Sequence, residues 1–85
     1  MLNYEIINDE IEYIPRVGDR VKILDYSYSS GLKRSVLSHF HNYKDIGIID
    51  LIYYQCNPIE YTITDNNSFK SYTFFGNEFE FVGRD

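Results

Sequence analysis

The absence of alanine beside an abundance of aromatic residues constrains the fold of this chain most. None of its 85 residues is alanine, the strongest helix former, whereas nine are Tyr and six are Phe. Aromatic and β-branched side chains fit the pleated, half-buried surface of a sheet. Each buried ring removes about 150–250 Å² from water, so a small chain can fill a core without metal or disulfide staples. We therefore expect a mainly β protein.

The size and composition of the chain predict one small domain spanning residues 1–85. No apolar run approaches the ~20 residues that span a bilayer, and the acidic start is unlike a secretory signal. The one thiol, Cys56, has no second cysteine with which to form an intramolecular disulfide. We expect a cytoplasmic protein that does not bind a membrane.

Short β-prone runs separated by turn signals occupy most of the chain. Residues 4–7 and 11–14 predict a hairpin or an extended arm that ends at Pro15. Gly47 predicts a bulge or a close approach, and a 3₁₀ turn is expected at 76–78. The remaining β-prone runs cover residues 20–24, 46–54, 61–64, 68–74 and 79–82. About five strands on so short a chain are expected to close into a small barrel that hides their edges.

The segment 25–45 is irregular and contains one predicted helix. Four apolar residues at helical spacing define its buried face: Leu32, Val36, Leu37 and Phe40. Ser29 or Ser30 is expected to cap it. Its opposite face carries Lys33, Arg34, Ser35 and Ser38.

Four motifs follow one another along the chain: 18–21 (Gly-Asp-Arg-Val), 47–49 (Gly-Ile-Ile), 61–63 (Tyr-Thr-Ile) and 77–82 (Asn-Glu-Phe-Glu-Phe-Val). Their order resembles that of SH3-like small β-barrels found in many bacterial and phage-encoded proteins. The resemblance implies an SH3-like barrel of about five strands at residues 16–82. Two features depart from a minimal barrel of this kind: the first long loop, with its short helix, is larger, and the N-terminal β arm at 1–15 is additional. Because loops and additions carry specificity in such folds, the long loop and the arm are the places to look for binding.

Metal binding and catalysis find little support in the sequence. On a helix, His39 and His41 would point about 200° apart, and Cys56 lacks a second thiol. We expect structural or solvated roles for these residues, with no metal and no other cofactor. No nucleophile beside an oriented base and no phosphate-binding loop is recognisable, so we do not expect an enzyme.

Tyrosine is too frequent for every hydroxyl to be buried and satisfied, and exposed Tyr is typical of protein interfaces. We therefore hypothesise a non-catalytic protein-binding module. The candidate contact residues are Tyr26, Tyr28, Lys33, Arg34 and Tyr43 in the long loop, and Glu10 and Glu12 in the arm. The many Ile, Asn and Tyr residues and the absence of Ala indicate an AT-rich genome, because Ala codons are GC-rich. Together with small size and acidity, this composition is typical of phage or mobile-element proteins. These features favour an inhibitor of a host nuclease or defence complex, with acidic side chains entering the basic channel of the host protein.

Nucleic-acid binding is the alternative, because the net charge of −5 is unevenly distributed. Residues 16–44 carry +4, whereas residues 1–15 carry −4. The candidate phosphate contacts are Arg20, Lys22, Lys33, Arg34 and Lys44. The overall acidity opposes this reading. An unpaired N-terminal strand leaves both a monomer and a two-fold homodimer open.

Overall fold

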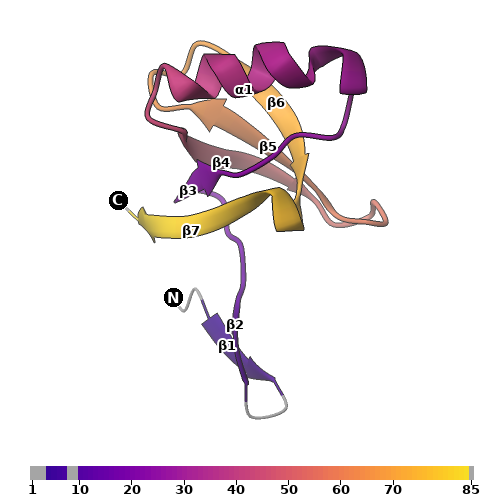
Figure 1. Cartoon of the computed structure of the whole chain (residues 1–85). Coiled ribbons are helices and arrows are strands. Elements are labelled where there is room, and N and C mark those ends of the chain that lie inside the picture. The colour runs from indigo at the N-terminus through magenta and orange to yellow at the C-terminus, as the bar shows by residue number, and fades with distance from the viewer. Residues whose placement is uncertain (1–3, 8–9, 85) are drawn as a thin grey trace.

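The computed structural model describes the backbone of residues 4–7 and 10–84 and the side chains of residues 13–83. It is mainly β, with one five-stranded antiparallel sheet, one short helix and an N-terminal hairpin (Figure 1). The sheet consists of β3 (Asp19–Ile23), β4 (Ile46–Tyr53), β5 (Glu60–Asp65), β6 (Ser71–Phe75) and β7 (Phe79–Arg84). Its strand order is β6-β5-β4-β3-β7, so the expected mainly β class is confirmed.

The sheet is open rather than closed. β6 and β7 are its two edge strands, and the 3₁₀ helix η2 (Gly76–Glu78) connects them at the expected position. No ladder joins the two edges within the described residues, so the expected closed barrel is not confirmed. The 3₁₀ helix η1 (Ser30–Leu32) leads directly into α1 (Lys33–His41). Helix α1 lies across one side of the open sheet (Figure 1).

Helix α1 packs on the side of the sheet that forms the core, here called the inner face. Val36 and Phe40 are buried as expected and Leu37 is half-buried, whereas Leu32, which was expected on the same face, is exposed in η1. The Phe40 ring centroid lies 5.5 Å from that of Phe74. The core consists of Val21, Ile23, Tyr26, Val36, Phe40, Ile49, Tyr61, Ile63, Phe74 and Phe79. Several of its rings meet edge to face, which is the favourable geometry for aromatic pairs.

Gly47 is packed tightly between the neighbouring strand β5 and helix α1. A Cβ at this position would lie 2.5 Å from Ile63 and 3.0 Å from Phe40. The expected close approach is therefore confirmed, because only a residue without a side chain leaves room for both Ile63 of β5 and Phe40 of α1. The register of β4 against β5 shifts between Ile49 and Leu51, two to four residues farther along the strand than Gly47.

The predicted cap of the helix is wrong. Neither Ser29 nor Ser30 makes a side-chain capping bond, and Leu32 is the N-cap residue. Because η1 runs directly into α1, the backbone carbonyls of the two serines accept the amides of Leu32 and Lys33 instead.

The N-terminal segment forms an antiparallel hairpin of β1 (Tyr4–Ile7) and β2 (Glu10–Tyr13), which lies on the far side of the sheet from α1 (Figure 1). Tyr13 connects it to the sheet. Its hydroxyl donates to the buried Asp19 carboxylate at 2.7 Å, and its ring centroid lies 5.0 Å from that of Phe81. No helix in the described part of the chain is both long and apolar enough to cross a membrane.

Candidate functional site

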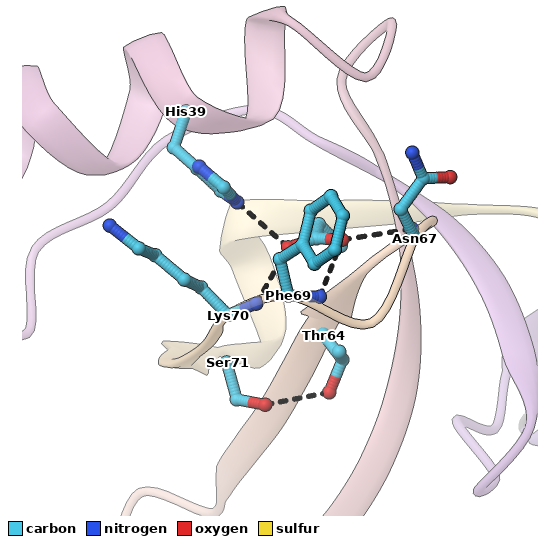
Figure 2. Close-up of polar contacts among 7 residues, drawn as sticks. His39, Thr64, Asn67, Phe69, Lys70 and Ser71 are labelled. Carbon is cyan, nitrogen blue, oxygen red and sulfur yellow. Dashed lines mark hydrogen bonds and ion pairs between the residues drawn. The ribbon is translucent and has the colours of Figure 1, made fainter.

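A network of hydrogen bonds surrounds Asp65, at the end of β5 (Figure 2). Its carboxylate is fully buried and lies 2.8 Å from Nε2 of His39 on α1. Three backbone amides of the β5–β6 turn donate to the same carboxylate: Asn67 at 2.8 Å, Phe69 at 3.1 Å and Lys70 at 2.7 Å. The cluster thus fixes the turn and joins it to the helix.

The electrostatics of this cluster are those of a structural carboxylate. Burial alone would raise the pKa of Asp65. The hydrogen bond from His39 and those from the three amides outweigh burial and bring the pKa to about 2. A group held ionised in this way has no proton to give near neutral pH. The cluster therefore explains stability rather than acid–base chemistry.

Two other buried carboxylates, those of Asp19 and Glu78, also accept hydrogen bonds from backbone amides. Asp19 accepts the Arg16 amide at 3.0 Å in addition to the Tyr13 hydroxyl. Glu78 in η2 accepts the Phe75 amide at 2.8 Å, and its own carbonyl accepts the amide of Leu24 at 2.7 Å. These contacts order the segments that enter and leave the sheet.

The histidines and the cysteine lie apart. His39 faces Asp65, whereas the His41 side chain is 81% exposed and lies 3.8 Å from Asp45. Cys56 is half-buried in the β4–β5 turn. Among the residues that the structure describes, no three His, Cys, Asp or Glu side chains are arranged to hold a metal ion.

The aromatic residues of the long loop are not equally available to a partner. Tyr26 is only 2% exposed and packs on Phe74, so the expectation that it offers a contact surface is wrong. Burial also raises the pKa of its hydroxyl. Tyr28 is 53% exposed, and Tyr43 is half-buried beside His39.

The charged candidates are also dispersed. Lys33 and Arg34 are exposed in the first turn of α1, and Lys33 is 3.0 Å from Asp25. The backbone of Glu10 and of Glu12 lies in β2, and their side chains are outside the described part. The structure therefore does not place the predicted partner contacts on one surface.

The basic residues proposed for nucleic acid lie on two sides of the molecule. Arg20 and Lys22 alternate in β3 with the buried Val21 and Ile23, so they belong to the outer face. Lys33 and Arg34 are on the helix that covers the inner face, and Lys44 follows its C-terminal end. No single face gathers all five.

One surface was missed by the sequence analysis. Tyr53, Glu60 and Phe75 are directly opposite one another on β4, β5 and β6. The next residue on β5, Tyr61, and that preceding Phe75, Phe74, are buried on the inner face, so the three belong to the outer face.

Tyr28 extends this surface from the long loop, because its ring centroid lies 6.2 Å from that of Phe75. Tyr53 is 36% exposed, and Glu60 and Phe75 are half-buried. We call Tyr28, Tyr53, Glu60 and Phe75 the aromatic row. Strand pairing creates it, so it was recognisable from sequence only once the register was known.

The opposite end of the same outer face is polar. A shallow hollow of about 340 Å³ is lined there by Ile48, Asp50, Thr64, Asp65, Ser68 and Ser71. The hydroxyls of Thr64 and Ser71 lie 2.7 Å apart across the two strands (Figure 2). The outer face thus changes from hydroxyl-rich at the β5–β6 turn to aromatic at the β4–β5 end.

Comparison with known proteins gives no match among family models, curated proteins or solved structures.

Proposed function

We propose that this protein is a non-catalytic protein-binding module that contacts its partner through the aromatic row. The observation that carries the proposal is the position of Tyr28, Tyr53 and Phe75 on one outer face. Tyr28 and Tyr53 remain accessible there although ten other hydrophobic residues are buried in the core. Accessible aromatic side chains that adjoin one another are typical of protein interfaces.

The proposal includes an SH3-like scaffold. Its support is the strand order β6-β5-β4-β3-β7, in which the last strand, β7, returns to lie beside β3, the first strand of this sheet along the chain. Further support comes from the long excursion between β3 and β4 and from η2 immediately before β7. In this scaffold the aromatic row lies at one end of the sheet, beside the long loop that supplies Tyr28.

A protein partner fits the charge distribution better than a nucleic acid. The net charge is −5, and the five candidate basic residues lie on two sides of the molecule. A phosphate backbone binds through several neighbouring cations, which this arrangement does not offer. A partner with a basic surface is attracted instead.

Within the proposal, a host nuclease or defence complex is a fitting partner. Its support is charge complementarity, since such proteins carry basic channels and this chain is acidic. The amino-acid composition, which is rich in Ile, Asn and Tyr and lacks Ala as in proteins from AT-rich genomes, supports a phage or mobile-element source.

Selection from a displayed library of random peptides tests the proposal. Peptides enriched on the wild-type protein are then measured against Tyr28→Ala and Phe69→Ala. Both variants lose an exposed aromatic ring, but Phe69 lies in the β5–β6 turn, away from the row. We expect Tyr28→Ala to weaken binding about tenfold and Phe69→Ala to leave it unchanged. Equal effects, or no enriched peptide, would contradict the proposal.

A further inference from the structure

Glu60 stands at the centre of the aromatic row. It lies directly opposite Tyr53 on one side and Phe75 on the other. Directly opposed residues have Cβ atoms about 4.5–5.5 Å apart, so a side chain seated on Glu60 would contact both rings. Tyr28 adds a third ring beside Phe75.

Glu60 has no cationic partner among the side chains that the structure describes, which are those of residues 13–83. Its polar neighbour is the thiol of Cys56. Partial burial raises the pKa of Cys56, and the charge of Glu60 and its hydrogen bond with the thiol raise it further. In contrast, buried Asp65 and Glu78 are bonded to backbone amides.

A carboxylate between aromatic rings has the chemistry of a cation site. The faces of the rings attract ammonium and guanidinium groups, and a carboxylate pairs with guanidinium through two parallel hydrogen bonds. Arginine fits both features, since its planar head stacks on rings while it donates in its plane.

We propose that the aromatic row holds an arginine side chain of a basic segment in the protein partner. This inference rests on the proposed function and specifies its chemistry. The guanidinium pairs with Glu60 and is flanked by Tyr53 and Phe75. The net charge of −5 favours the approach of such a segment.

An NMR titration with two peptides tests the inference. The probes are a short Gly/Ser peptide with one central arginine and the same peptide with citrulline, the neutral analogue of arginine. Salt at about 0.15 M limits charge effects to roughly 8 Å. The proteins are wild type, Glu60→Gln and Glu80→Gln. The last removes the same charge from an exposed site on β7.

We expect the arginine peptide to bind wild type about tenfold more tightly than the citrulline peptide and to shift the amides of the row. Glu60→Gln abolishes this preference, and Glu80→Gln retains it. Equal binding of the two peptides, an arginine preference that survives Glu60→Gln, or no binding of either peptide at the row would overturn the inference.

The library selection separates this inference from the proposed function. Selected peptides that bind the row without any basic residue would overturn the inference and leave the proposed function standing. A single-stranded oligonucleotide is the third probe. If it binds through Lys33 and Arg34 while no peptide perturbs the row, both proposals are overturned.

Discussion

His39 on α1 and Asp65 at the end of β5 face each other with 2.8 Å between Nε2 and Oδ2. The pair is 26 residues apart in sequence, and it attaches the helix to the turn that follows β5. The carboxylate also holds three amides of that turn, so one buried group orders two separate segments.

Loss of the histidine is expected to destabilise the fold. His39→Ala leaves a buried carboxylate without one of its hydrogen bonds, which lowers the free energy of unfolding by roughly 1–3 kcal/mol. His41→Ala is the matched control, because that ring is exposed, and its effect is expected within about 0.5 kcal/mol. Urea unfolding at pH 7 measures both. Equal effects would contradict the role of the pair.

The low pKa of Asp65 predicts a specific acid sensitivity. Its pKa is about 2 in the folded state and about 3.9 in an unfolded chain, so the folded state is favoured when the group is ionised. Its contribution is complete above about pH 4 and is lost as the pH falls toward 2. In Asp65→Asn, the melting temperature should fall less than that of the wild type between about pH 4 and pH 2, as measured by thermal unfolding. Asp50→Asn, at an exposed carboxylate, should show the same fall as the wild type. The same acid profile in both variants would contradict the prediction.

Gly47 is expected to tolerate no side chain. Gly47→Ala places a methyl group 2.5 Å from Ile63 and 3.0 Å from Phe40, so the helix or the sheet must shift. We expect the free energy of unfolding to fall by roughly 1–3 kcal/mol in urea unfolding. Gly31→Ala has open space around it and is expected to change stability by less than about 1 kcal/mol. A Gly47→Ala protein as stable as wild type would refute the close packing.

Two tyrosines of one loop should behave differently. Tyr26→Ala empties a core position and is expected to cost roughly 3–5 kcal/mol. Tyr28→Ala removes an exposed ring and is expected to cost less than about 1 kcal/mol. Thermal unfolding of the two variants checks this division. A large loss in Tyr28→Ala would mean that the ring serves the fold rather than a partner.

The elements of the fold were largely predictable from the sequence because their patterns are local. Apolar spacing located the helix, although α1 begins at Lys33, two or three residues later than a cap at Ser30 or Ser29 implies. Alternation in 20–24 matched β3 (Asp19–Ile23). The 3₁₀ turn before the last strand was also expected and is present. Closure of the sheet was not predictable, because β6 and β7 are at opposite edges of the sheet and no local pattern specifies whether two such edges pair.

The candidate site was less predictable because it depends on contacts between distant residues. Tyr26 and Tyr28 have the same local pattern, and only the packing of the loop buries one and exposes the other. Glu60 drew no attention in the sequence, since its neighbours in the row are distant in sequence and are brought together by strand register.

Amide NMR mapping of a library-selected peptide tests most directly whether the outer face is the binding surface. We predict that the largest shifts fall at Tyr28, Tyr53, Glu60 and Phe75, with little change at Lys33, Arg34 and Lys44. Shifts concentrated at those three basic residues, with the aromatic row unperturbed, would contradict the assignment.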